Sequence, residues 1–145
     1  MEKDRLILRN ISRTSKIFHE YVRGECEKLG IPASFHGVIM NLARCNGQSQ
    51  LELSQKLMLS KPTITITLQK MEQLGYIERL QDEQDARITR VYLTNSGKEL
   101  DNKIINIFKK IEEKVSSVLS EEKQNELFEM LNTINNELKS LKGEQ

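Results

Sequence analysis

The sequence predicts a mainly α-helical protein with one small β-hairpin. Apolar residues recur at helical spacings of three, four or seven along most of the chain. Strand-like segments flank a single polar stretch, residues 81–87. Only 2 of the 145 residues are proline, so little in the chain interrupts helices.

Composition narrows the class of protein further. A chain with 37% hydrophobic and 30% charged residues predicts a soluble globular protein with many exposed helix faces. It has no apolar run of the roughly 20 residues that a membrane helix needs and no signal-peptide core, so we expect a cytoplasmic protein without a membrane partner. Residues 99–145 carry 10 acidic and 7 basic side chains, so this end is not expected to face phosphate.

Two helices are expected before residue 48. The first runs from about Asp4 to Leu29, and Gly30 and Pro32 end it. The second follows Pro32 and stops at Asn46 and Gly47. Their apolar stripes are Ile7, Ile11, Phe18 and Val22, then Phe35, Val38, Ile39 and Leu42.

Two short helices with a tight break follow. Ser49 and Glu52 have the spacing of a capping box. Ser60 is placed to cap the next helix, Pro62 falls in its first turn, and Gly75 is a C-terminal stop.

Residues 63–68 alternate and are rich in β-branched side chains, which by propensity alone favours a strand. Ile64, Leu68 and Met71 nevertheless keep helical spacing between a cap and a stop signal. We therefore predict a helix here.

Residues Tyr76–Leu80 and Ile88–Leu93 are predicted strands of a hairpin. Helix, turn, helix and hairpin in this order form a winged helix-turn-helix. Two long helices, starting near Asn95 and Ser120, carry apolar stripes that such a unit does not cover, so we expect them to pack on a second copy. The predicted segments are 1–32 for dimerisation, 33–98 for DNA binding and 99–145 for dimerisation.

The most specific motif is DEQDARITRVYLTNSG, from Asp82 to Gly97, and LSKPTITITLQKMEQLGYIER precedes it. Together they resemble the wing and recognition helix of the MarR family of bacterial transcriptional regulators, and the likeness extends over nearly the whole chain. The matching positions are Ser60, Thr63, Thr65, Glu72, Gly75, Asp85, Arg87, Leu93, Thr94 and Gly97.

The outer face of the predicted recognition helix has side chains that suit a DNA groove. Gln69 can read an adenine, Lys70 can neutralise a phosphate, and Ile66 can touch a thymine methyl. Relatives commonly hold Arg at the position of Ile66, so we expect an A·T-rich half-site. The alternative is a solvated helix face with an exposed Ile. The predicted DNA-binding residues of this helix are Ser60, Lys61, Pro62, Thr63, Thr65, Ile66, Gln69 and Lys70.

The wing contributes a second set of predicted contacts. The resemblance implies that Arg87 enters a minor groove, where negative potential is greatest over narrow A·T tracts. Asp85 can orient its guanidinium by a charge-assisted bond, and Arg90 is predicted to contact phosphate. The alternative is a solvated salt bridge in a loop.

The sequence says less about the signal to which such a regulator would respond. The resemblance implies a small aromatic or phenolic acid as effector, bound near the end of the first helix and the start of the second. Candidate effector residues are His19, Arg23, Phe35 and His36, although each also has a structural interpretation. Cys26 and Cys45 are interpreted as inert thiols rather than as redox sensors.

The sequence contains no motif of an enzyme, a cofactor site or a metal site. The predicted function is a homodimeric regulator, acting as a repressor, that binds a pseudo-palindromic operator in double-stranded DNA. The alternative is a helical dimer that does not bind DNA, either a protein-interaction adaptor or a ligand-binding protein.

Overall fold

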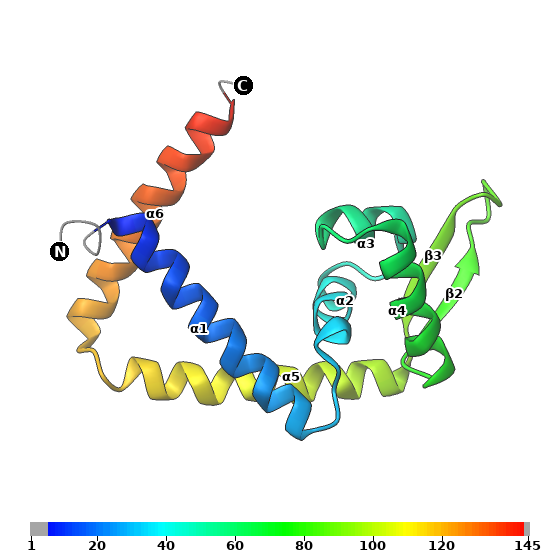
Figure 1. Cartoon of the computed structure of the whole chain (residues 1–145), viewed down its shortest axis with the longest axis horizontal. Helices are drawn as coiled ribbons and strands as arrows, with labels where there is room; N and C mark the ends of the chain where they lie inside the picture. The colour runs from blue at the N-terminus through cyan, green and yellow to red at the C-terminus, as the bar shows by residue number, and fades with distance from the viewer. Residues whose placement is uncertain (1–5, 144–145) are drawn as a thin grey trace. The chain divides into compact units, whose positions relative to one another are not determined.

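The computed structural model describes residues 6–143 and confirms the expected class, mainly helical with a small antiparallel sheet (Figure 1). The chain divides into two compact units, at residues 107 and 108. Helix α5 (Asn95–Ser116) begins in the first unit and ends in the second. The predicted start of the first helix at Asp4 lies outside the described residues.

Helices α1 (Ile7–Lys28) and α2 (Ala33–Arg44) are joined by a tight turn. Gly30 adopts φ +72°, and the amide of Ile31 then bonds the carbonyl of Cys26 at 2.9 Å. This left-handed residue closes α1 at the predicted place, because glycine has no Cβ to oppose the conformation. The predicted stripe of α2 is buried as Phe35, Val38, Ile39 and Leu42.

Helices α3 (Gln50–Lys56) and α4 (Lys61–Gln73) begin at the predicted caps. Ser49 Oγ accepts from the Glu52 amide at 3.1 Å, and the Glu52 carboxylate accepts from the Ser49 amide at 2.7 Å. Ser60 Oγ accepts from the Thr63 amide at 3.3 Å. These bonds satisfy amides that a helix start leaves without intrahelical partners.

Residues 61–73 form the predicted helix, α4, although their β-branched side chains favour a strand. Ile64, Leu68 and Met71 are fully buried on one face. Burying each such side chain contributes about 1.5–3 kcal/mol, which exceeds the few tenths that β-branching costs in a helix. Thr67 is also buried, with its hydroxyl donating to the Thr63 carbonyl at 3.0 Å.

The sheet has the order β1-β3-β2, and all pairing is antiparallel. Strands β2 (Ile77–Gln81) and β3 (Thr89–Leu93) form the hairpin, and each begins one residue later than predicted. Strand β1 (Gln48–Ser49) was not predicted. It pairs with β3 at Gln48 opposite Val91, so the segment that leads into α3 is attached to the hairpin. Figure 1 shows the hairpin beside α4.

A close approach joins the hairpin to the start of α5. Thr94 Oγ1 accepts from the Gly97 amide at 3.1 Å and donates to the Gly75 carbonyl. A Cβ on Gly97 would lie 2.1 Å from the Tyr76 carbonyl oxygen. Only glycine therefore permits this contact between backbones.

The second unit contains the end of α5 and helix α6 (Glu121–Gly143). Ser120 Oγ accepts from the Lys123 amide at 3.4 Å, as predicted for the start of this helix. No residue of α6 is buried. Its exposed large apolar side chains are Leu127, Phe128, Met130, Leu138 and Leu141. Among the described residues, no helix combines the length and apolar character that crossing a bilayer requires.

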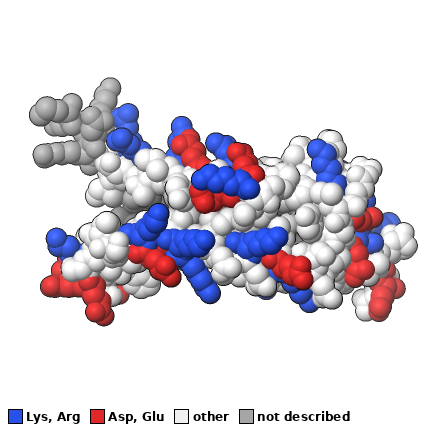
Figure 2. Space-filling view, turned by 90° about the horizontal axis from the view of Figure 1, so that it is seen from below, with Lys and Arg blue, Asp and Glu red and all other residues white. Residues whose placement is uncertain are grey.

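Charges of both signs are mixed on the surface. The face viewed in Figure 2 shows Lys and Arg side chains interspersed with Asp and Glu. The whole chain has a formal net charge of only +1.

Candidate nucleic-acid interface

The outer face of α4 is exposed as predicted. Ile66 lies at its centre with 54% of its surface accessible, opposite the buried Ile64 and Leu68. Around Ile66 the compact side chains of Pro62 and Thr63 lie toward the start of the helix, and the longer Gln69 and Lys70 lie toward its end. Its other exposed predicted residues are Lys61, Pro62, Thr63, Gln69 and Lys70.

Three predicted contact residues, Ser60, Thr63 and Thr65, also have side-chain hydrogen bonds inside the protein. Ser60 caps α4, and its Oγ lies 2.8 Å from Thr63 Oγ1. Thr65 Oγ1 donates to the Lys61 carbonyl at 2.7 Å and accepts from Gln50 Nε2 at 2.8 Å. Their hydroxyls therefore help to shape the helix start.

Gln50 was not among the predicted site residues. It is the first residue of α3, and its amide spans to Thr65 on α4, 15 residues along the chain. No local pattern signals such a contact, because it depends on how the two helices pack. Gln50 joins the helix-turn-helix to the edge of the candidate interface.

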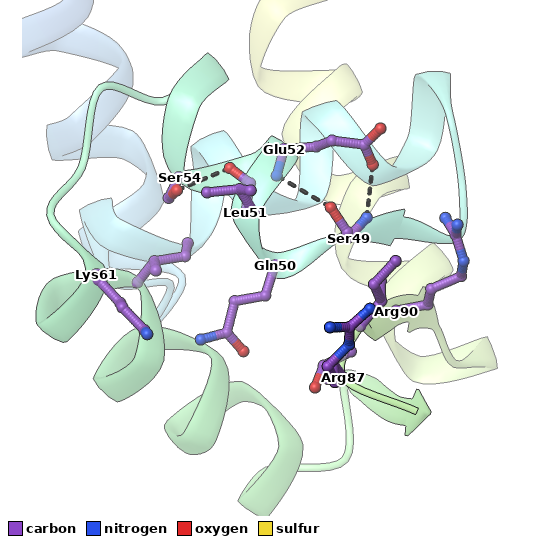
Figure 3. A pocket seen from close by; sticks show the side chains of 11 residues that line it. Ser49, Gln50, Leu51, Glu52, Ser54, Lys61, Arg87 and Arg90 are labelled. Carbon is purple, nitrogen blue, oxygen red and sulfur yellow. Dashed lines mark hydrogen bonds between the residues drawn. The ribbon is translucent and has the colours of Figure 1, made fainter. Parts of the chain in front are cut away.

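A cavity of about 470 Å³ lies beside this edge. Figure 3 shows Gln50 of α3, Lys61 of α4 and Arg87 of the wing around it. Three of its lining side chains are basic and one is acidic, and two of the basic ones, Arg87 and Arg90, are paired with Asp85 and Asp82. The lining residues are Ser49, Gln50, Leu51, Glu52, Ser54, Lys61, Ile64, Arg87, Ile88, Thr89 and Arg90.

The wing loop holds Arg87 in a defined position. Arg87 Nε donates to Asp85 Oδ1 and Nη2 donates to Oδ2, both at 3.0 Å. The Arg87 amide also donates to Asp85 Oδ1 at 3.0 Å. These bonds lower the pKa of the Asp85 carboxyl below its ordinary value. The Arg87 side chain is still 90% exposed. Its guanidinium is therefore both held in one orientation and accessible to solvent.

Arg90, the other predicted wing contact, is bonded within the protein. Its Nε donates to Asp82 Oδ1, and its Nη1 donates to the Gly47 carbonyl at 3.0 Å. The hydrogen bond from Arg90 is the largest cause that lowers the pKa of the Asp82 carboxyl. Sequence reasoning placed Asp82 only in a polar loop and did not assign it a role.

The four candidate effector residues lie on α1 and α2 in different environments. His19 and Arg23 are exposed, and the ring of His19 lies 5.3 Å from that of Phe18. Phe35 is a core residue whose ring meets Tyr76 edge-on at 6.2 Å. Burial, followed by the charge of His19, lowers the pKa of His36.

The thiols differ in environment. Cys26 is buried, and desolvation followed by the charge of Glu25 raises its pKa, which disfavours the reactive thiolate. Cys45 is exposed. Within residues 6–143, no group of three or more His, Cys, Asp or Glu side chains is arranged to hold a metal ion.

The two capped helices and the hairpin, with an exposed arginine in its loop, define a winged helix-turn-helix protein. The model of the MarR family matches residues 33–89. The HTH-type transcriptional regulator BilQ of Clostridium symbiosum is 29% identical over 114 residues, which are 79% of each chain. The crystal structure of a MarR transcriptional regulator from Methanosarcina mazei Go1 is 30% identical with a TM-score of 0.76, and the match covers 92% of this chain and 96% of that one.

The fold is also shared with an S. aureus MepR mutant bound to an oligodeoxyribonucleotide. That structure has a TM-score of 0.64 at 24% identity, and the match covers 92% of this chain and 99% of that one. The chain belongs to the MarR family. It is a transcriptional regulator of the helix-turn-helix type, as are the relatives named above.

Proposed function

We propose that this MarR-family regulator is a repressor that binds a pseudo-palindromic operator in double-stranded DNA as a homodimer. One observation carries the proposal. Arg87 is 90% exposed and yet held by Asp85, on a hairpin that packs beside α4. An ion pair this exposed adds little to the stability of the loop, whereas its oriented guanidinium is available to a partner.

In this proposal α4 enters the major groove and Arg87 enters the adjacent minor groove. Gln69 is suited to adenine and Lys70 to phosphate, while Ile66 contacts thymine methyl groups. Arg87 favours a narrow A·T minor groove because the potential there is most negative. The preferred half-site is therefore A·T-rich. The fold shared with the MepR mutant that binds an oligodeoxyribonucleotide supports this geometry.

The homodimer is supported by uncovered apolar faces in both units. Phe128 on α6 is 63% exposed, and Ile17 on α1 is 58% exposed. Monomeric proteins rarely leave such stripes in water, so a second copy is the simplest cover. A two-fold dimer would present its two α4 helices to successive major grooves, about 34 Å apart.

Release by a small aromatic or phenolic acid completes the proposal. His19, Arg23, Phe35 and His36 are its candidate contacts. The acid would weaken DNA binding by favouring a dimer in which the two α4 helices no longer match the groove spacing. Titrating salicylate into the protein–operator complex tests this step. Unchanged DNA affinity at saturating salicylate would contradict release by that acid.

The decisive experiment selects bound duplexes from a randomised pool and then titrates salt against the enriched site and a scrambled site. Enrichment of an A·T-rich palindrome with a steep salt dependence is expected. A folded dimer that enriches no sequence would contradict the proposal and favour an adaptor or ligand-binding protein. For repression, a promoter overlapping the enriched site should be transcribed less when the protein is added, and unchanged transcription would contradict that part.

A further inference from the structure

We propose that Asp82 and Arg90 form a clasp that sets the direction of the wing and thereby places Arg87. Both are positioning residues in this assignment, which rests on the proposed DNA-binding function. It gives Arg90 a different role from the phosphate contact that the sequence predicts.

One carboxylate organises the start of the wing loop. Asp82 Oδ2 accepts from the amides of Gln84 and Asp85, both at 3.0 Å. Its other oxygen, Oδ1, accepts from Arg90 Nε on β3. The turn of the loop is therefore tied to the strand that returns from it.

Arg90 carries this connection to the helix-turn-helix. Its Nη1 donates to the carbonyl of Gly47, 43 residues earlier in the chain. The Gly47 amide in turn donates to the Val91 carbonyl at 3.0 Å. Gly47 itself has little freedom, because it adopts φ +79° and a Cβ there would lie 2.8 Å from the ring of Tyr92. The wing loop is thus fastened to the segment that enters α3.

Asp82 and Arg90 are much less exposed to solvent than Arg87 is. The side chains of Asp82 and Arg90 are 16% and 35% exposed, against 90% for Arg87. In Figure 3 the side chains of Arg87 and Arg90 diverge from the same end of the wing. Arg90 uses two separate nitrogens of its planar guanidinium to reach two acceptors, and a lysine ammonium cannot reproduce that geometry.

The connection to Arg87 runs through Asp85. Asp82 holds the Asp85 amide, and the Asp85 carboxylate holds the guanidinium of Arg87. Loosening the clasp therefore moves the base from which Arg87 reaches the DNA. The substitution Arg90→Lys loosens the clasp in this way. It leaves the number of positive charges at the interface unchanged and does not alter Arg87 itself.

The test is a double-mutant cycle of Arg90→Lys with Arg87→Ala, read as affinity for the selected operator. We expect Arg90→Lys to weaken binding roughly threefold to tenfold when Arg87 is present, and by less than about twofold in the Arg87→Ala background. Asp82→Asn, which keeps one acceptor oxygen for the turn, should repeat this pattern. Arg13→Lys, the same change at an exposed position on α1, is the control and should leave affinity unchanged.

Two results would overturn the assignment. Wild-type affinity of Arg90→Lys would mean that Arg90 acts only through its charge, and equal losses in both backgrounds would mean that it acts independently of Arg87. Hydrogen exchange of the free protein tests the clasp without DNA, since Arg90→Lys should speed exchange of the Gln84 and Asp85 amides. If the wild type binds no duplex, the proposed function fails. Unchanged hydrogen exchange of these two amides in Arg90→Lys would separately overturn the clasp.

Discussion

Gln50 Nε2 donates a 2.8 Å hydrogen bond to Thr65 Oγ1 and so connects the first residue of α3 to the exposed helix α4. The same hydroxyl donates to the Lys61 carbonyl in the first turn of α4. One threonine thus joins the two helices of the helix-turn-helix. The bond lies at the edge of the candidate interface, where a small rotation of α4 would change which side chains its outer face presents.

Gln50→Ala should lower the free energy of unfolding by about 0.5–1.5 kcal/mol, because it removes a hydrogen bond between helices. Urea denaturation at a fixed protein concentration measures the change. Gln55→Ala, at an exposed position on the same helix, is the matched control and should change stability by less than about 0.5 kcal/mol. Equal effects of the two variants would contradict a stabilising role for the Gln50–Thr65 bond.

Arg87→Ala should weaken operator binding and lower the salt slope by roughly one counterion per wing, about two per dimer. The measurement is log affinity against log salt concentration. Arg87→Lys is the control for charge, since it should keep most of the slope while losing the paired bonds to Asp85. An unchanged slope for Arg87→Ala would show that the wing does not contact DNA.

Ile66→Asn should alter base preference more than overall affinity, because Asn can bond an adenine where Ile offers only a methyl contact. Repeating the duplex selection with the variant checks this. The side chain is 54% exposed, so the substitution leaves the core intact and thermal stability should stay close to that of the wild type. A uniform loss over all sequences would instead assign Ile66 to positioning of the helix.

Gly97→Ala should destabilise the protein by at least about 1–3 kcal/mol, because its Cβ would lie 2.1 Å from the Tyr76 carbonyl oxygen, which is backbone and cannot rotate away. The comparison is Gly24→Ala on α1, which meets nothing within 4 Å. That control should raise stability by about 0.5–1 kcal/mol, the usual gain from replacing glycine in a helix. Similar unfolding curves for both variants would contradict the close approach.

His36 should make stability depend on pH below neutrality. Burial and the charge of His19 lower its pKa in the folded chain below the ordinary 6.5, so the unfolded chain binds the proton first as the pH falls. Stability is therefore fully present above pH 6.5 and is lost as the pH falls through the lower folded value. Unfolding free energies at a series of pH values should show this loss, and His36→Gln should reduce it. Identical pH profiles for His36→Gln and the wild type would refute the assignment.

Much of the fold could be predicted because its signals are local. Ser49 with Glu52, Ser60 and Gly75 mark helix boundaries within a few residues of sequence, and the structure places them there. Strand β1 was missed because two residues carry no periodicity, and it exists only through pairing with β3.

The parts of the candidate site that depend on local sequence were predicted, and the parts that depend on contacts between distant segments were not. The exposed face of α4 follows from the period of its buried residues, and the Asp85–Arg87 pair lies within three residues. The partner of Arg90 did not follow, because the pattern shows its charge but not the Asp82 and Gly47 oxygens that surround it.

Periodicity, caps and turn residues act over one or two helical turns. The order of the main elements, the family and the outer face of α4 could therefore be predicted from the sequence. Contacts between distant segments depend on how those elements pack. The Gln50–Thr65 bond spans 15 residues and the Arg90–Gly47 bond spans 43. The bond of Arg90 to the Gly47 carbonyl depends on the antiparallel pairing of β1 with β3, because that pairing brings the Gly47 oxygen within reach of the guanidinium.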